Sequence, residues 1–574
     1  MWSSRRDPHR RGPRRGHRSR GLEFRNRRRR RRPFHTCDLL TNAFSRYPRT
    51  APETPFCDRL PSERRTAIDR TTMDEILRRA LYDFGTLLTV YAALPSITVP
   101  VAIGLGEGYA APGFAVAAAV AFGFGRGIEA VFDPPEDANG LSAGVITVSV
   151  GWFLTGVLSA LPLLFVAWTV RLEPSVLATP PMTGSLATFL APIDATFEGM
   201  SGVTGTGFSM ASDPGELPRS LQWWRSLVQW VGGIGVIVLA AAFASSEESD
   251  SFSAIHGSMA PTESIRSTTQ GTAAALWWLL ALVTVAAALW LWLVGMGPWA
   301  ALNHAMTGVT TGGFTITGSS VESYDDAVIE TALLPVMIVG AVSFSVLFFL
   351  FRGDLERIWG DAQTVWLFGA LALGAVVTVG ALVATGSYPT TTAAVRYGTF
   401  QLVSGLTCTG FQSDTVLGDA WAAPGLLAVT LSMVVGGAAG STAGGVKIVR
   451  VRRILLDAPE HGMDVYEPSE SSADTAGEAS AAFDTAAVIA VLWFVLLFVT
   501  SLVALLVLPA EYATGEVLFE VASVQGNVGL STGIVDATIP ATLKVTLLLA
   551  MWIGRLEIVP VVVSARLLYD EVVG

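Results

Sequence analysis

The chain has few charged residues and very few cysteines. Charged residues make up 15% of its 574 residues, whereas soluble proteins usually carry about a quarter, so an ordinary soluble domain is excluded. The three cysteines, Cys37, Cys57 and Cys408, are too few and too scattered for a disulfide framework or a zinc site.

Sequence motifs for catalysis and nucleotide binding are also absent. We find no Walker loop and no HExxH, which argues against nucleotide binding by this chain and against an intramembrane metalloprotease. No hydrophobic segment carries arginine at every third position, so voltage sensing by an arginine-rich helix is excluded as well.

The charges that are present are unevenly distributed. Residues 1–72 hold 21 of the 38 basic residues, all arginine, against 7 acidic residues. This Arg-rich extension is either a disordered basic tail that touches nucleic acid or anionic lipid, or a mis-assigned start upstream of Met73. We favour the second interpretation because such arginine density without lysine is typical of GC-rich upstream sequence, and we expect no nucleic-acid partner.

Long hydrophobic runs follow Met73. A membrane-spanning helix needs about 20 largely apolar residues. Nine charge-free runs of about this length occur, at 85–106, 109–125, 138–170, 226–246, 267–302, 331–351, 362–395, 421–446 and 485–510. A tenth segment, 537–565, is also apolar but contains Lys544, Arg555 and Glu557. The sequence therefore predicts an all-α polytopic membrane protein with ten crossings.

Ten crossings place both termini on one side of the membrane. Basic residues gather on that side, including Arg78, Arg352 and Arg450. Since cytoplasmic loops carry an excess of lysine and arginine, we expect both termini in the cytoplasm and the chain in the cell membrane.

An internal repeat occurs four times between the hydrophobic runs. Each copy follows a short amphipathic stretch, so the repeating unit is helix, half-helix, loop and helix, after an opening helix pair. The copies align on Gly207, Gly313, Gly410 and Gly529 and read SGVTGTGFS (201–209), TGVTTGGFT (307–315), SGLTCTGFQ (404–412) and SVQGNVGLS (523–531). Four copies in register are hard to explain as helix packing alone.

The repeated loops have the properties of a cation pore. Irregular backbone survives at membrane depth only where it is buried or lines a water-filled path, and glycine lets carbonyl groups turn inward. Four such loops around one axis can replace the hydration shell of a cation, and the half-helices aim their negative dipole ends at it.

Polar residues precede each repeated glycine at fixed distances. We expect them to hydrogen-bond the loops from behind. Those six residues before are Ser201, Thr307, Ser404 and Ser523, and those nine before are Glu198, His304, Gln401 and Glu520. Acidic residues follow the loops at Asp213, Glu322, Asp414 and Asp536; they either concentrate cations or reflect loops that are acidic throughout the chain.

Together these motifs resemble the Trk/Ktr/HKT superfamily of potassium transporters, and the opening helix pair is most similar to its TrkH type. The resemblance covers about 85–570 and rests on the four loops with QWVGGIGVIVL (229–239), VGGAAGSTAGGVKIVR (435–450) and MWIGRLEIVPV (551–561). It implies potassium uptake by a homodimer whose protomers each hold a pseudo-fourfold pore. It also implies a cytoplasmic nucleotide-binding regulatory subunit of the TrkA (RCK) type. K⁺ is then the transported ion, with no covalently bound cofactor.

The resemblance assigns a selectivity filter to the four loops. An all-glycine set is associated with potassium preference in the family. The predicted filter residues are Thr204, Gly205, Thr206, Gly207, Thr310, Thr311, Gly312, Gly313, Thr407, Cys408, Thr409, Gly410, Asn527, Val528 and Gly529. A potassium symporter coupled to H⁺ or Na⁺, with Glu198 and Glu520 as ion sites, remains the alternative.

A glycine-rich stretch in the third repeat is expected to interrupt its second helix. Each glycine costs about 1 kcal/mol of helix propensity, and in the family this break is the intramembrane gating loop. The predicted gate comprises Gly436, Gly437, Gly440, Ser441, Thr442, Gly444, Gly445, Lys447 and Arg555. A close helix–helix contact is the alternative for the glycine-rich stretch.

Two charged residues belong to this predicted gate. Lys447 would anchor the lower half-helix. Arg555, expected midway along the last helix where a charge is expensive, faces the pore as a barrier in the family. Pairing of Arg555 with a buried acid is the alternative, although Glu557, two residues on, is expected to be a poor direct partner.

The predicted domain organisation follows from the repeats. It comprises the extension 1–72, the helix pair 73–137, repeat 1 at 138–250, repeat 2 at 251–360, repeat 3 with the gating loop at 361–457, a cytoplasmic linker at 458–481 and repeat 4 at 482–574.

Overall fold

The computed structural model describes residues 62–132, 140–173, 177–244, 269–414, 421–466 and 473–573. Within these ranges the secondary structure is helical and contains no strand, so the predicted all-α fold is confirmed. The predicted extension up to residue 61, the loop 247–266 and part of the linker 458–481 lie outside the described residues.

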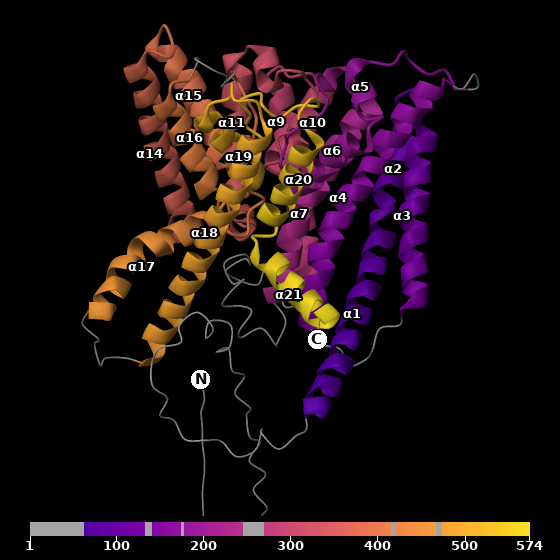
Figure 1. The fold of residues 1–574 in the computed structure, drawn as a ribbon. Coiled ribbons are helices and arrows are strands. Elements are labelled where there is room, and N and C mark those ends of the chain that lie inside the picture. Colours follow the sequence, from indigo (N-terminus) through magenta and orange to yellow (C-terminus); the bar gives the residue numbers. More distant parts are fainter. Residues whose placement is uncertain are drawn as a thin grey trace, which may run out of the picture. The chain divides into compact units, whose positions relative to one another are not determined.

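Two helical segments open the described chain. α1 (Ser62–Tyr91) runs almost directly into α2 (Ala93–Gly104), and α3 (Ala111–Val131) returns beside them (Figure 1). α1 and α3 approach closely because Gly125 has no side chain: a Cβ there would lie 2.7 Å from the carbonyl oxygen of Gly85. Such small-residue contacts are typical of helices packed in a membrane.

The predicted unit of long helix, half-helix and second helix recurs four times. The half-helices lie in the same half of the helical layer (Figure 1). Unit 1 is α4 (Gly140–Leu172), α6 (Pro192–Thr204) and α7 (Arg219–Ala244); unit 2 is α9 (Thr269–Leu293), α10 (Pro298–Val309) and α11 (Ala327–Ala341). Unit 3 is α14 (Ala362–Thr385), α15 (Thr391–Leu406) and α16 (Ala423–Val435); unit 4 is α18 (Ala473–Val507), α19 (Thr514–Gln525) and α20 (Ala541–Arg555).

Short elements connect these helices. They are α5 (Gly184–Thr188), η1 (Pro214–Glu216), η2 (Ser320–Tyr324) and α13 (Glu356–Gly360). Helices α17 and α18 extend into the predicted linker 458–481. The unit boundaries proposed from the sequence stay predictions.

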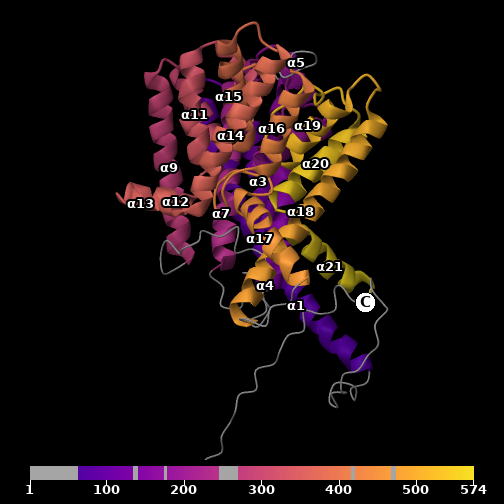
Figure 2. The same ribbon diagram turned by 90° about the vertical axis from the view of Figure 1, so that its left-hand side faces the viewer.

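The second helices of units 2, 3 and 4 are interrupted. α11 bends by 107° into α12 (Phe344–Phe351), and α20 bends by 106° into α21 (Val559–Val573). In unit 3, a loop separates α16 from α17 (Ile448–Tyr466). Figure 2 shows α12 running across the direction of α9. The second helix of each of these three units is thus divided in two, and α12 and α21 point in a direction far from that of α11 and α20.

Six described helices are long and apolar enough to cross a membrane, or eight spans if each bent pair counts as one. The remaining two predicted crossings, 226–246 and 421–446, correspond to α7 and to the 13-residue α16, which are not among the eight. The total of ten crossings therefore stays a prediction.

Polar contacts tie the second helix of one unit to the half-helix of the next. Glu330 of α11 pairs with Arg396 of α15 at 2.7 Å, and Lys544 of α20 pairs with Asp194 of α6. Ser226 of α7 likewise donates a hydrogen bond of 2.7 Å to Asn303 of α10. These contacts join unit 1 to unit 2, unit 2 to unit 3 and unit 4 to unit 1, and α16 of unit 3 packs against α19 of unit 4, so the four units form a closed cycle.

Candidate ion-conduction site

The four repeated loops adopt the same backbone conformation. Each repeated glycine has a positive φ, between 75° and 101°. The residue two positions earlier is also left-handed: Gly205 (66°), Thr311 (49°), Cys408 (56°) and Asn527 (53°). The residue between these two positions does not have a positive φ. All four loops therefore share the same sequence of left-handed and ordinary backbone conformations.

One backbone hydrogen bond holds each loop against the end of its half-helix. The N–H of the residue before the repeated glycine donates to the carbonyl five residues earlier. These bonds are Thr206 to Ser201 (2.8 Å), Gly312 to Thr307 (2.7 Å), Thr409 to Ser404 (2.9 Å) and Val528 to Ser523 (2.9 Å). The internal repeat seen in the sequence is therefore also a repeat of hydrogen bonding.

The four loops close into a ring through their glycines. A Cβ on Gly207 would lie 2.5 Å from the carbonyl oxygen of Gly312, and one on Gly529 would lie 2.6 Å from that of Thr206. The same overlap would occur between Gly313 and Thr409 and between Gly410 and Val528. Each loop thus meets the next in the order 1, 2, 3, 4 and back to 1, and glycine is required at all four contacts.

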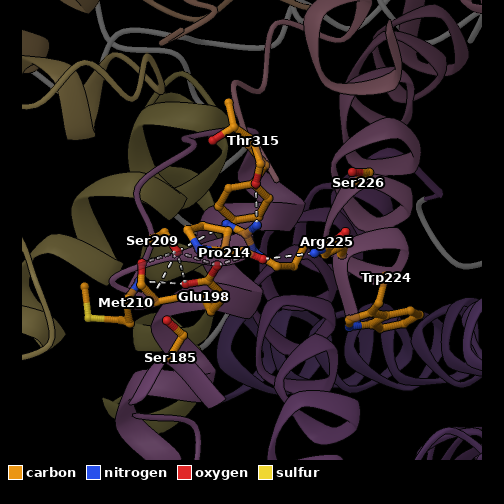
Figure 3. Close-up of polar contacts among 12 residues, drawn as sticks. Ser185, Glu198, Ser209, Met210, Pro214, Trp224, Arg225, Ser226 and Thr315 are labelled. Carbon is orange, nitrogen blue, oxygen red and sulfur yellow. Dashed lines mark hydrogen bonds and ion pairs between the residues drawn. The ribbon is translucent and has the colours of Figure 1, made fainter. Parts of the chain in front are cut away.

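A buried ion pair supports the first loop (Figure 3). Glu198 of α6 accepts hydrogen bonds from the backbone N–H of Met210 (2.7 Å) and from Nε of Arg225 (2.6 Å). Arg225, on α7, also donates to the carbonyl of Thr315 at 2.8 Å in the second loop. Both side chains are at most 2% exposed. The pair therefore joins loops 1 and 2 from behind.

The expectation for the other three positions is confirmed in two loops and wrong in one. Glu520 accepts from the N–H groups of Thr532 (2.9 Å) and Ile534 (3.0 Å), and Gln401 donates to the carbonyl of Asp414 (2.7 Å). His304 instead bonds Ala300 within its own helix. Its ring packs 5.5 Å from the ring of Phe411, a residue of the next loop.

The side-chain hydroxyls six residues before each glycine share no single contact. Thr307 donates to the carbonyl of Phe314 at 2.8 Å, and Ser523 accepts from the N–H of Gly529 at 3.1 Å. The hydroxyls of Ser201 and Ser404 have no hydrogen-bond partner among the described residues. The expectation that all four support their loops is therefore wrong for these two serines.

Gln229 is a loop-supporting residue that sequence reasoning missed. Its side-chain amide donates to the carbonyl of Gly312 (2.5 Å) and accepts from the N–H of Phe314 (3.0 Å). It lies four residues after Arg225 on α7, so both side chains share one helix face. Two polar residues four positions apart on an otherwise apolar helix were the sequence signal that could have identified Gln229 as a loop-supporting residue.

The outer acidic residues make local contacts. Asp213 accepts from the N–H of Gly215 (2.8 Å), and Asp536 accepts from that of Thr538 (2.7 Å). Asp414 accepts from the Tyr388 hydroxyl, and burial together with this carboxylate raises the pKa of Tyr388 above its ordinary value. Each of these three carboxylates therefore accepts a hydrogen bond from a donor of its own unit.

The glycine-rich stretch of unit 3 is not helical, so the predicted break is present. Positive φ occurs at Gly436, Gly440, Gly445 and Lys447. The N–H of Phe344 donates to the carbonyl of Gly440 (2.9 Å), and that of Gly445 donates to the carbonyl of Gly526 (3.1 Å). This loop, 436–447, which we call the intramembrane loop, therefore contacts both the α11–α12 bend and the fourth repeat.

Thr442 of the intramembrane loop contacts the underside of the ring. Its hydroxyl lies 3.1 Å from that of Thr311, and its carbonyl accepts from Nη1 of Arg555 at 2.8 Å. A Cβ on Gly205 would lie 3.8 Å from the same nitrogen. Arg555 is 4% exposed, and its Nε and Nη2 atoms have no hydrogen-bond partner among the described residues.

The expected position of Arg555 in mid-helix is wrong. Arg555 is the last residue of α20, because Glu557 and Ile558 adopt positive φ and break the helix. Glu557 makes no pair with Arg555, as expected. It pairs instead with Arg450 and lies 4.0 Å from Nζ of Lys447, which in turn donates to the carbonyl of Ala443.

Comparisons with known proteins agree with this architecture. A family model described as a cation transport protein, TrkH, matches residues 142–572. An uncharacterized cation transporter of Methanocaldococcus jannaschii is 31% identical over 386 residues, covering 66% of this chain and 77% of the relative. The Trk system potassium uptake protein TrkH of Halomonas elongata is 30% identical over 435 residues, covering 73% and 84%.

A solved structure has the same fold. The crystal structure of the potassium transporter TrkH from Vibrio parahaemolyticus superposes with a TM-score of 0.71 at 23% identity, covering 84% of this chain and 97% of that one. The match of the family model spans well over half of the chain. The chain therefore belongs to the TrkH family of cation transport proteins.

Proposed function

We propose that the chain forms a pore for potassium uptake across the cell membrane. The observation that carries the proposal is the closed ring of four loops, in which each repeated glycine lies against the carbonyl that precedes the repeated glycine of the next loop. Backbone carbonyls in such a ring can replace the hydration shell of K⁺. Relatives that match most of this chain are named potassium uptake proteins.

The proposed filter consists of the predicted residues of the four loops, from Thr204–Gly207 to Asn527–Gly529. Glu198, Arg225 and Gln229 hold its shape from behind, since their bonds end on loop backbone. K⁺ is the transported ion, and no covalently bound cofactor is part of the proposal. The chemistry is the exchange of water ligands for carbonyl ligands, so we propose transport rather than catalysis.

The proposed gate is the intramembrane loop together with Arg555. The loop contacts the ring through Thr442 and Thr311, and Arg555 lies between Thr442 and the first loop. A fixed positive charge beneath the filter opposes a permeating cation. Opening therefore requires the loop and Arg555 to move relative to the ring.

We do not propose coupled transport. Of its candidate ion sites, Glu198 is neutralised by Arg225 at 2.6 Å. Glu520 has one carboxylate oxygen committed to backbone and hydroxyl donors of its own loop. Both carboxylates therefore have structural contacts that explain their burial.

We further propose that both termini lie in the cytoplasm and that the chain works as a homodimer with a TrkA-type nucleotide-binding subunit. The orientation rests on the basic residues Arg352, Arg450 and Arg453, which gather on the side of the N-terminus. The assembly rests on the family resemblance and on relatives named as parts of a Trk system.

Complementation tests the transport proposal. The full chain should restore growth at limiting potassium in a bacterium that lacks its own uptake systems. A Gly207→Ser variant should lose potassium-supported growth or become dependent on sodium, because serine in the first loop accompanies sodium transport in some relatives.

Membrane expression must be confirmed for each strain, and a strain with a TrkA-type subunit is run in parallel. Failure of the expressed wild type in both strains would contradict potassium uptake. Unchanged growth and ion preference in Gly207→Ser would contradict the filter assignment.

Removing the charge of Arg555 should increase cation flux. In Arg555→Gln the electrostatic barrier is lost, and a neutral amide can still reach the carbonyl of Thr442. At an effective dielectric constant of 20, a charge at 4 Å opposes a cation by about 4 kcal/mol before screening. We expect at least a severalfold higher rubidium flux into vesicles, and Arg566→Gln, on α21, serves as a control. Equal flux in Arg555→Gln and wild type would show that Arg555 is not a barrier.

A further inference from the structure

Helix α12 departs from the direction of the helix that precedes it. It bends by 107° from α11, and seven of its eight residues, FSVLFFLF, are apolar. Figure 2 shows α12 and α13 extending sideways past α9. The apolar surface of α12 therefore does not follow the direction of the spanning helix α11.

An open groove separates α12 from the N-terminal half of α9. Its volume is about 430 Å³, and its lining includes Trp278, Leu279, Leu282, Phe348, Phe351 and Arg352. The side chains of Trp278 (78% exposed), Leu282 (52%) and Phe351 (55%) face outward. The groove is therefore apolar and opens toward the bilayer.

Arg352, which has no hydrogen bond or ion pair to its side chain among the described residues, lies at the end of this groove. It follows directly after α12 and is exposed. Its guanidinium carbon lies 4.5 Å from the ring centroid of Phe348. Arg357, five residues on, differs because it lies 3.6 Å from the Asp354 carboxylate.

We propose that the groove binds an anionic phospholipid, with its phosphate at Arg352 and one acyl chain between α9 and α12. An apolar groove in contact with lipid is filled by hydrocarbon at lower cost than by water. A basic side chain at the membrane surface attracts anionic headgroups. Exposed tryptophans, Trp278 and Trp359, are typical of the interface at which a headgroup lies.

The lipid site is connected to the intramembrane loop by one backbone hydrogen bond. Phe344, the first residue of α12, donates its N–H to the carbonyl of Gly440 at 2.9 Å. A lipid that fixes α12 therefore also fixes this contact. The resulting effect on flux rests on the proposed function of the loop, whereas the binding site itself does not.

Native mass spectrometry of the full chain tests binding directly. Mixed micelles of phosphatidylglycerol and phosphatidylcholine supply the probe. Wild type should retain phosphatidylglycerol in preference, and Arg352→Gln should bind it about fivefold more weakly, since one basic residue near the surface contributes about that factor. The matched control Arg357→Gln removes a cation that is already paired and should bind as wild type does.

A second pair of variants tests the groove. Leu282→Trp places a large side chain in it and should reduce phosphatidylglycerol retention severalfold. Leu289→Trp changes a residue of the same helix with the same exposure, 51% against 52%, outside the groove. Equal retention in Arg352→Gln and Arg357→Gln, or in the two tryptophan variants, would overturn the lipid site.

Flux into vesicles then tests the link to the loop. Wild-type rubidium flux should differ at least twofold between pure phosphatidylcholine and vesicles containing phosphatidylglycerol, and Arg352→Gln should abolish the difference. Selective binding without this difference in a conducting wild type would overturn the link. A wild type that conducts in neither vesicle would contradict the proposed function, while the binding experiment still decides the lipid site.

Discussion

Substituting Gly410 by alanine should reduce cation flux at least about 100-fold. Gly410 has a φ of 82°, and a Cβ there would lie 2.8 Å from Cα of Gly529 and closer still to the carbonyl oxygen of Val528. A left-handed alanine costs about 1–2 kcal/mol, and overpacking costs about 1–3 kcal/mol more. About 3 kcal/mol corresponds to 100-fold fewer molecules with the loop in place.

Gly205→Ala is the matched control for this prediction. Gly205 also has a positive φ, 66°, but the nearest atoms to its Cβ would lie 3.8 Å away. The equivalent positions in the other loops hold Thr311, Cys408 and Asn527, so the fold accommodates a side chain there. We expect Gly205→Ala to keep at least about a thirtieth of the wild-type flux, given a strain of about 1–2 kcal/mol.

Rubidium uptake by cells with equal amounts of protein in the membrane provides the measurement. A uniform loss in Gly205→Ala and Gly410→Ala would show that left-handed strain alone, and not the closed ring, makes glycine necessary. Normal flux in Gly410→Ala would contradict the proposed filter itself.

Sequence reasoning succeeds where a feature is local and repeated. The four glycines stand out because each follows a half-helix at the same distance, and the break at Gly436–Gly445 is visible because glycine weakens a helix wherever it occurs. These features follow from backbone preferences of the residues themselves. They therefore need no knowledge of distant contacts.

The other two breaks have a weaker local signal. Gly554 and Pro560 flank the bend at Glu557 and Ile558, and Gly340 precedes the α11–α12 bend at Val342 and Ser343, but single glycines and prolines also occur in helices of this chain that stay unbroken. Both bends form where distant residues supply partners: Arg450 for Glu557, and Gly440 for Phe344. Tertiary contacts override helix propensity at these positions.

The residues that support the loops from behind also depend on contacts that the sequence does not reveal. Alignment of the repeats predicts that His304 acts like Glu198, yet the aromatic ring of Phe411 occupies the space beside it. Gln229 reaches Gly312 across 83 residues of sequence. A contact between units depends on how the helices pack, which the spacing within one repeat does not contain.

Neutralising Glu557 should destabilise the protein strongly. Glu557 is 6% exposed and is the acid that faces Arg450 and Lys447 where α17 begins. In Glu557→Gln, Arg450 and Lys447 lose the negative charge of this carboxylate, and Arg555 lies only two residues away. Breaking a buried ion pair from one side costs about 3–5 kcal/mol, so we expect a clear fall in the melting temperature of the purified protein.

Asp354→Asn is the matched control, because it removes the acid of an exposed pair, with side chains 45% and 46% exposed. Exposed pairs contribute at most about 1 kcal/mol, so the melting temperature should hardly change.

A double variant separates pairing from a simple loss of packing. In Glu557→Gln with Arg450→Met, one cation disappears with the acid, and much of the stability should return, since replacing both partners of a buried pair is often close to neutral. Lys447 keeps its bond to Ala443 in this variant. If the double variant lost as much stability as Glu557→Gln and Arg450→Met lose together, the pairing would be contradicted. Recovery in the double variant would show that this ion pair holds the start of α17 against the α20–α21 bend, where the intramembrane loop ends and Arg555 lies.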